Sequence, residues 1–136
     1  MISVAIQLKA QFYDLDPMGM VWHGHYARYL EEARCALLDH IGYNYQQMAE
    51  SGYLWPIVEM QLKYVRPLQF QQEMRITATL VEYENRARID YLIVDPHTEQ
   101  VITRARTTQV AVDANSKEMQ LVSPAIFLQK VQQVLT

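Results

Sequence analysis

The chain has 136 residues, half of them hydrophobic, and a formal net charge of −3 at pH 7. This length predicts one domain over residues 1–136 with an adequate core, and the weak negative charge argues against a nucleic-acid-binding protein. No apolar run is long enough to span a bilayer, and residues 1–5 lack the basic start and apolar run of a secretory signal. The single cysteine, Cys35, excludes an intrachain disulfide, and together these features predict a cytoplasmic protein.

Hydrophobic periodicity predicts a strand followed by two helices in the first part of the chain. Apolar and polar residues alternate over residues 4–13, which is typical of a half-buried strand. Over residues 24–41 apolar residues recur at steps of three and four, so we expect an amphipathic helix of about four turns. Gly42 is placed as its C′ residue, and Asn44 is expected to cap a short second helix that ends near residues 51–52.

The rest of the chain shows the alternation of strands. Four strands are predicted, at residues 57–65, 74–83, 86–94 and 100–112. Short turns make neighbouring strands antiparallel, and Ser123 and Pro124 are placed as the N-cap and first residue of a C-terminal helix. A long helix followed by antiparallel strands must bury itself against one sheet face. We therefore expect an α+β fold in which a curved antiparallel sheet wraps around the helix.

The segment between the first strand and the long helix carries the most informative residues. It reads Tyr13-Asp14-Leu15-Asp16-Pro17-Met18-Gly19-Met20-Val21-Trp22-His23-Gly24-His25-Tyr26. The first N–H groups of a helix lack partners inside the helix and carry the positive end of its dipole, so they favour an oxyanion or a polarised carbonyl oxygen. Asp16 could fold back over that spot as a nucleophile or general base. On spacing alone, an Asp before a Pro is more often a turn or capping residue.

Several of these residues resemble a known family. The pattern Asp-x-Asp-x-x-Gly-x-Val-x-His-x-x-Tyr is matched by Asp14, Asp16, Gly19, Val21, His23 and Tyr26. Together with Glu32-Ala33-Arg34 and Lys63-Tyr64-Val65-Arg66-Pro67-Leu68, it resembles the 4-hydroxybenzoyl-CoA thioesterase family, including the type encoded beside the Tol–Pal system. The resemblance covers nearly the whole chain and implies the hotdog fold and hydrolysis of an acyl-CoA or acyl-carrier-protein thioester.

The resemblance also implies roles for individual residues. Asp16 would be the catalytic carboxylate, the backbone N–H of His23 would polarise the thioester carbonyl, and Gly19 would permit a tight turn. The family forms dimers, often dimers of dimers, so we expect a homodimer or homotetramer in which residues 55–61 of the partner line the acyl pocket. The expected substrate-binding residues are Gly19, Val21, Trp22, Tyr26, Trp55, Val58, Met60 and Arg66.

Some of these residues have a second interpretation. Aromatics such as Trp22 and Tyr26 at helical spacing are often simple core residues. His23 and His25 with one carboxylate fall short of a metal site, so we expect no metal and no cofactor. Cys35 has no basic cluster beside it in sequence and is not expected to be a nucleophile. The basic residues that could meet coenzyme A phosphates, or simply form the polar sheet face, are Lys63, Arg66, Arg86, Arg88, Arg104 and Arg106.

Two other functions stay open at this stage. A hotdog dehydratase or hydratase would have a His-x6-Pro-Gly-His or Asp-x4-His pattern; the first is absent, and the spacing from Asp16 to His23 does not match the second. A non-catalytic acyl-thioester-binding module would keep the fold without turnover. Release of free thiol from an acyl-CoA distinguishes the thioesterase from the binding module.

Overall fold

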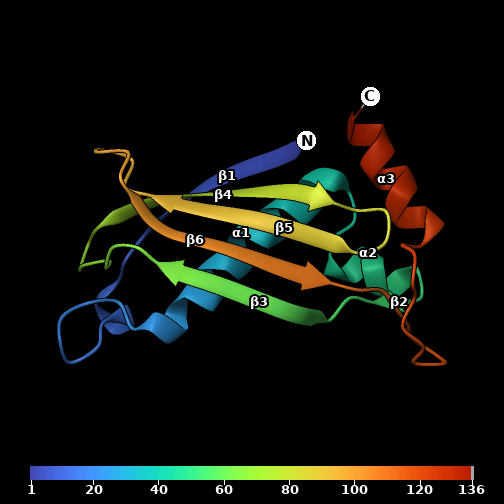
Figure 1. The fold of residues 1–136 in the computed structure, drawn as a ribbon, viewed down its shortest axis with the longest axis horizontal. Coiled ribbons are helices and arrows are strands. Elements are labelled where there is room, and N and C mark those ends of the chain that lie inside the picture. Colours follow the sequence, from blue (N-terminus) through green and yellow to red (C-terminus); the bar gives the residue numbers. More distant parts are fainter. Residues whose placement is uncertain (136) are drawn as a thin grey trace.

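The computed structural model describes residues 1–135, and their main feature is a five-stranded antiparallel sheet wrapped around one long helix (Figure 1). The strands are β1 (Ile2–Lys9), β3 (Ile57–Tyr64), β4 (Glu73–Glu82), β5 (Ala87–Val94) and β6 (Val101–Gln109). Their order in the sheet is β1-β4-β5-β6-β3. A separate two-stranded ladder joins β2 (Tyr53–Leu54) to β7 (Val112–Asp113). The α+β architecture expected from the sequence is therefore confirmed.

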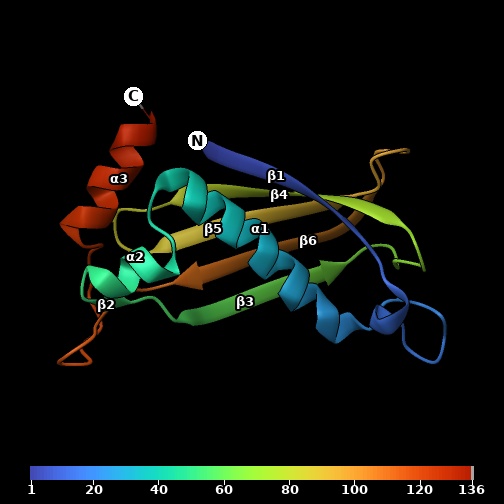
Figure 2. The same ribbon diagram turned by 180° about the vertical axis from the view of Figure 1, so that it is seen from behind.

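The helices lie on the concave face of the sheet and at one end of it (Figure 2). They are α1 (Tyr26–Ile41), α2 (Tyr45–Glu50) and α3 (Ala125–Leu135), with 3₁₀ turns η1 (Phe12–Asp14) and η2 (His23–His25). Because η2 runs directly into α1, the long helical segment in effect starts at His23. The predicted end of α1 and the predicted start of α2 are confirmed. Gly42 adopts a left-handed φ of 81° after α1, and the Asn44 side chain caps α2 by accepting a hydrogen bond from the N–H of Gln47.

The core lies between α1 and the sheet. Alternate residues of β4 and β5, such as Met74, Ile76, Ile89 and Ile93, are fully buried, which is the outcome of one apolar strand face packing on a helix. Eight residues of α1 are buried: Tyr26, Tyr29, Leu30, Ala33, Arg34, Leu37, Leu38 and Ile41. This wide buried stripe follows from the curvature of the sheet, which covers the helix on more than one side.

Three expectations about element bounds are wrong. The first strand stops at Lys9, because the Asp14 carboxylate accepts the backbone N–H of Gln11 and the chain turns into η1. Phe12 belongs to the apolar alternation of residues 4–13 but is 75% exposed. The run 100–112 is divided, since β6 ends at Gln109 and β7 pairs elsewhere. The Ser123 hydroxyl is buried with no hydrogen-bond partner among residues 1–135, so it does not cap α3.

The strand β3 forms one edge of the sheet. It pairs only with β6, and its other edge meets no strand among residues 1–135. Ile57, Val58 and Met60 on this edge strand are 36%, 56% and 37% exposed, respectively. A long edge strand with exposed apolar side chains is a surface on which another strand can pair.

Across the described residues, no helix is long and apolar enough to span a membrane.

Candidate active site

Asp16 begins a tight turn that fixes one of its carboxylate oxygens. Its Oδ1 accepts hydrogen bonds from the backbone N–H groups of Met18 (2.9 Å) and Met20 (3.2 Å), and its carbonyl oxygen accepts the N–H of Gly19 (3.0 Å). Asp, Pro and Gly occupy positions one, two and four of this turn, where each is favoured. No hydrogen bond within the described residues engages Oδ2. The turn therefore orients the carboxylate through Oδ1 and leaves Oδ2 unengaged within the described residues.

The far side of this turn is tied to the loop that follows β3. The N–H of Val21 donates to the carbonyl of Leu68 (2.9 Å), and Met20 forms an antiparallel bridge with Gln69. Gly19 has a φ of 81°, a left-handed conformation in which a side chain is strained even though none would clash here. The role expected for Gly19, to permit the tight turn, agrees with this geometry.

The start of the helical segment presents two unengaged backbone donors. Trp22 and His25 donate their N–H groups to the carbonyls of Asp14 and Trp22 (3.0 Å each), but the N–H groups of His23 and Gly24 find no acceptor within the described residues. The Trp22 indole lies over Gly24, where a Cβ would come within 2.3 Å of the ring. Free N–H groups at the positive end of a helix dipole can stabilise a negatively charged oxygen.

Asp14 is a buried anchor between η1 and α1. Its side chain is 1% exposed, accepts the Gln11 N–H (2.9 Å) and forms an ion pair with Arg28. Burial acts to raise the pKa of this carboxyl, but the Gln11 N–H, the Tyr29 hydroxyl and the Arg28 guanidinium outweigh it and hold the pKa below its ordinary value. Asp14 is therefore charged at neutral pH, and it holds the segment before Asp16 against the first turns of α1.

A hollow of about 310 Å³ lies where these elements meet. Its lining residues are Asp16, Met18, Met20, Val21, His23, Tyr26, Tyr64, Val65, Arg66 and Pro67. The ring of Tyr26 is buried and stands edge-on to that of Tyr64, with ring centroids 4.9 Å apart. Burial raises the pKa of Tyr26, so its phenol stays protonated at neutral pH. The hollow thus combines one carboxylate with apolar and aromatic walls.

The structure gathers about half of the expected site residues around this hollow. Asp16, His23, Val21, Tyr26 and Arg66 line it directly. Trp22 lies beside it, 48% exposed, with its ring between those of His23 and His25 at 5.2 and 5.4 Å.

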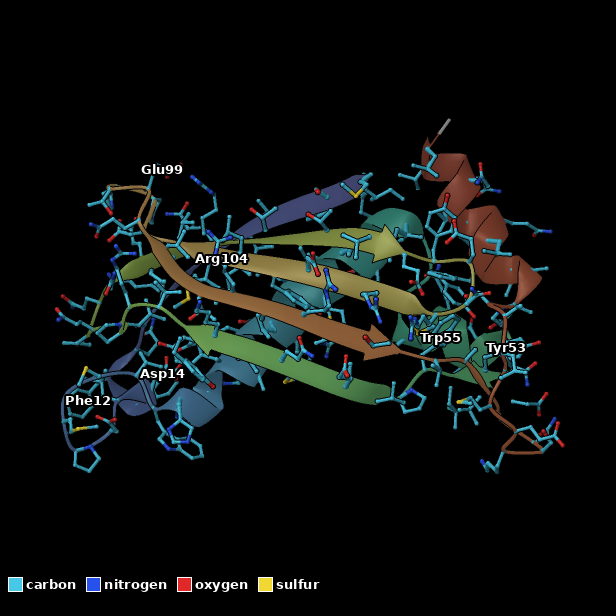
Figure 3. The ribbon with its side chains drawn as sticks, viewed as in Figure 1. Phe12, Asp14, Tyr53, Trp55, Glu99 and Arg104 are labelled. Atoms are coloured by element: carbon cyan, nitrogen blue, oxygen red, sulfur yellow. The ribbon has the colours of Figure 1, made fainter. Side chains whose placement is uncertain are left out.

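The remaining expected residues lie away from the hollow of their own chain. Val58 and Met60 are on the edge strand β3. Trp55 is 5% exposed, packs against Tyr43 and Phe127, and lies at the opposite end of the molecule from Asp14 (Figure 3). Within one chain, residues 55–60 therefore do not contribute to the hollow that Asp16 lines.

Sequence reasoning missed several lining residues, of which Tyr64 is the most prominent. Its hydroxyl donates a hydrogen bond to the carbonyl of His23 (3.0 Å). The sequence pattern places Tyr64 only within the predicted strand at residues 57–65 and gives it no role in the site. Its place next to Arg66, within the segment that carries the family resemblance, was a signal that could have pointed to it. Met18, Met20, Val65 and Pro67 were missed because only the tertiary structure brings their loops together.

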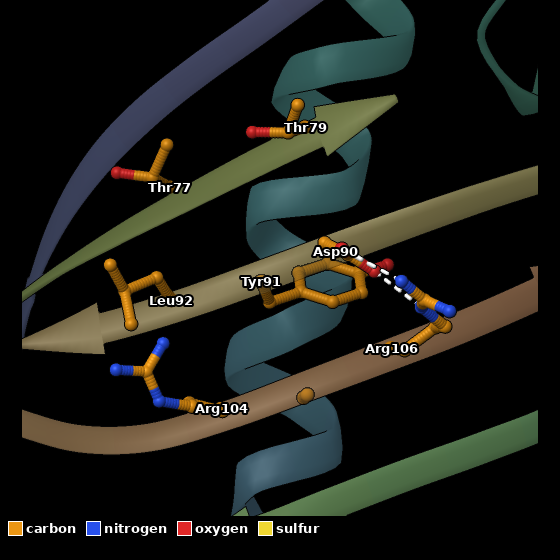
Figure 4. A pocket seen from close by; sticks show the side chains of 8 residues that line it. Thr77, Thr79, Asp90, Tyr91, Leu92, Arg104 and Arg106 are labelled. Carbon is orange, nitrogen blue, oxygen red and sulfur yellow. Dashed lines mark hydrogen bonds and ion pairs between the residues drawn. The ribbon is translucent and has the colours of Figure 1, made fainter. Parts of the chain in front are cut away.

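Three of the six candidate phosphate-binding residues form ion pairs with carboxylates of the sheet. Arg86 and Arg88 pair with Glu82 (2.6 and 3.9 Å), and Arg106 pairs with Asp90 (2.5 Å). Arg104 lies with Arg106 in a hollow of about 390 Å³ on the face of the sheet that points away from α1 (Figure 4). Of the six candidates, Arg66 alone lines the hollow that contains Asp16.

No three side chains of His, Cys, Asp or Glu gather as a metal site would require in the part of the chain that the structure describes. His23 and His25 instead contact the Trp22 ring. The hollow itself is lined by the Asp16 carboxylate and by His23, at the start of the helical segment.

Comparisons with known proteins identify the family of the chain. The family model of the thioesterase-like superfamily matches residues 10–132. The Bacillus subtilis protein YneP, whose name provisionally calls it an acyl-CoA thioesterase, is 27% identical over 111 residues, which are 81% of this chain and 80% of YneP. ATL3 of Arabidopsis thaliana, a chloroplastic acyl-acyl carrier protein thioesterase, is 29% identical over 122 residues, 87% of this chain and 63% of ATL3.

Solved structures show the same fold at low sequence identity. The DHNA-CoA thioesterase of Staphylococcus aureus matches with a TM-score of 0.84 and 19% identity, covering 99% of this chain and 89% of that one. Slr0204 of Synechocystis, a 1,4-dihydroxy-2-naphthoyl-CoA thioesterase, matches with a TM-score of 0.84 and 17% identity over 98% of both chains. The hotdog fold is thus confirmed. The chain belongs to the thioesterase-like superfamily and is a thioesterase of the hotdog fold.

Proposed function

We propose that the protein hydrolyses the thioester of an acyl-CoA or acyl-carrier protein at the hollow lined by Asp16 and His23. One observation carries the proposal: Asp16 and His23, the first residue of the helical segment, line the same hollow. Within the described residues, Oδ2 of Asp16 accepts no hydrogen bond, and the first N–H groups of that segment have no acceptor. A thioester carbonyl placed there would have a nucleophile or base on one side and oxyanion donors on the other. The signature from Asp14 to Tyr26 supports placing the chain near the 4-hydroxybenzoyl-CoA thioesterases.

Two routes are chemically consistent with this arrangement. In the first, Oδ2 of Asp16 adds to the carbonyl carbon, the C–S bond breaks, the thiolate leaves, and water then cleaves the acyl-aspartyl anhydride. In the second, a water molecule adds directly, Asp16 takes its proton, and the proton passes to the departing thiolate. A thiol with a pKa of about 8.5 leaves readily, so neither route needs a strong general acid.

The acyl pocket is proposed to need a second copy of the chain. Pairing of two β3 edges would bring residues 55–61 of one copy toward the hollow of the other, which one chain leaves open on that side. The exposed apolar residues Ile57, Val58 and Met60 support such a contact, because it would bury them. A homodimer, or a tetramer built from it, is the expected assembly.

The test is thiol release, followed with a chromogenic disulfide, from aromatic, short-chain and long-chain acyl-CoAs and acyl-carrier proteins. Asp16→Asn should keep the fold and lower kcat about 100-fold or more. Glu118→Gln, an exposed carboxylate outside the hollow, is the matched control and should retain full activity. Wild-type turnover that persists in Asp16→Asn would remove Asp16 from the mechanism. Binding of substrate with no thiol release by the wild type would favour an acyl-binding module.

A further inference from the structure

Tyr64 is the last residue of β3, and it reaches across to the start of the helical segment. Its hydroxyl donates to the carbonyl of His23 at 3.0 Å, and its ring packs edge-on against Tyr26, with an interplanar angle of 88°. Its ring also lies 6.4 Å from that of His23. Because the only phenolic proton of Tyr64 is engaged by this carbonyl, the hydroxyl does not point a free proton into the hollow.

The carbonyl that Tyr64 holds belongs to the same peptide group as one of the free donors. The C=O of His23 and the N–H of Gly24 lie in one plane and point in opposite directions, as in every trans peptide. No cis peptide bond occurs in residues 1–135. The N–H of Tyr26 also donates to the His23 carbonyl, so two donors hold this oxygen. Fixing the C=O in this way fixes the direction of the Gly24 N–H.

We propose that Tyr64 is a positioning residue that orients and polarises the peptide between His23 and Gly24 for oxyanion binding; this rests on the proposed thioesterase function. A hydrogen bond to a carbonyl oxygen draws electron density toward it and makes the N–H of the same peptide a stronger donor. Two donors on the His23 carbonyl therefore strengthen the Gly24 N–H. Gly24 has no side chain of its own, and the Trp22 indole packs where a Cβ would lie.

This arrangement makes the oxyanion donors depend on the sheet as well as on the helix. Within the described residues, the other bond on the His23 carbonyl comes from Tyr26, inside the helical segment itself. Tyr64 is the contact that ties this peptide to β3, the edge strand with the exposed apolar residues. A shift of β3 would therefore change the donor geometry directly.

Tyr64→Phe tests the proposal because it removes the hydroxyl and keeps the ring contact with Tyr26. We expect kcat to fall about tenfold with KM changed less than about twofold, a smaller loss than removing an oxyanion donor outright. Tyr13→Phe is the matched control: Tyr13 is 75% exposed, its hydroxyl has no hydrogen bond within the described residues, and its removal should leave kcat unchanged. Unchanged kcat in Tyr64→Phe, or a raised KM with full kcat, would overturn the proposal.

A second readout separates positioning from a general structural effect. The chain has only four glycines, so ¹⁵N-glycine labelling yields four amide signals. In Tyr64→Phe the Gly24 signal should move, while those of Gly19, Gly42 and Gly52 stay in place. A lower kcat with an unmoved Gly24 signal, or with all four signals moved, would refute the role assigned to this peptide. Failure of the thioesterase function is distinguished by Asp16→Asn, which tests that function independently of Tyr64.

Discussion

Replacing Asp14 with Asn should destabilise the protein at neutral pH, and the loss should shrink as the pH falls. The Asp14 carboxylate is 1% exposed and accepts charge-assisted hydrogen bonds from the Gln11 N–H and from Arg28. The pKa of Asp14 is held below its ordinary value of 3.8. A carboxyl with a depressed pKa adds stability above the unfolded-state pKa, and this contribution is lost as the pH falls from about 4 through the folded-state pKa.

The size of the effect follows from these contacts. A hydrogen bond to a charged group contributes about 1.5–3 kcal/mol. Arg28 is 45% exposed, so water screens its share of the ion pair. We therefore expect the Asp14→Asn variant to lose about 2 kcal/mol of the free energy of unfolding at pH 7. For a chain of this length, such a loss lowers Tm by about 7 °C.

Urea unfolding of both proteins, followed by circular dichroism at pH 7 and near pH 3, measures this difference. Equal destabilisation at the two pH values would refute the reasoning, since it would show that the charge on Asp14 is irrelevant. Asp39→Asn is the control. Its carboxylate is exposed and, within the described residues, accepts a side-chain hydrogen bond only from the Asn44 amide (3.1 Å), so the free energy of unfolding should change by about 0.5 kcal/mol or less.

Two further substitutions test the helix start and the edge strand. Gly24→Ala would place a Cβ 2.3 Å from the Trp22 ring, so the half-exposed Trp22 side chain must move. The fluorescence of Trp22 should change while that of buried Trp55 does not, and kcat should fall by about tenfold or more. An unchanged spectrum with full activity would contradict the packing described. Val58→Lys should weaken self-association in sedimentation, because it places a charge on the proposed β3 contact. Leu121→Lys, at an 80% exposed residue outside the strands of the sheet, should not. If the wild-type protein sediments as a monomer at assay concentrations, the proposal of an acyl pocket shared between two chains is refuted.

Local sequence patterns were sufficient for most elements of the fold. The alternation in residues 74–83 and 86–94 predicts β4 and β5 within one residue at each end, because one face of each strand is buried. Gly42 and Asn44 mark the end of α1 and the start of α2, since left-handed φ values and side-chain caps are properties of single residues. The first strand was predicted to extend too far, because apolar Phe12 continues the alternation. In the structure the chain turns into η1 after Lys9, where the Asp14 carboxylate accepts the N–H of Gln11.

In the candidate site too, features that depend on local contacts were predictable from the sequence, and features that depend on distant contacts were not. The turn at Asp16 is encoded by Asp16, Pro17 and Gly19 over four residues, and the unengaged N–H groups follow from where the helix begins. The local sequence therefore determined where the proposed catalytic carboxylate and the proposed oxyanion donors lie. The contact of Tyr64 with His23 joins residues 41 positions apart in the sequence. That contact, and the position of β3 at the edge beside β6, depend on how the whole sheet closes around α1. Only the tertiary structure decided them, because periodicity and turn chemistry act over a few residues, whereas strand order minimises the exposed apolar surface of the entire chain.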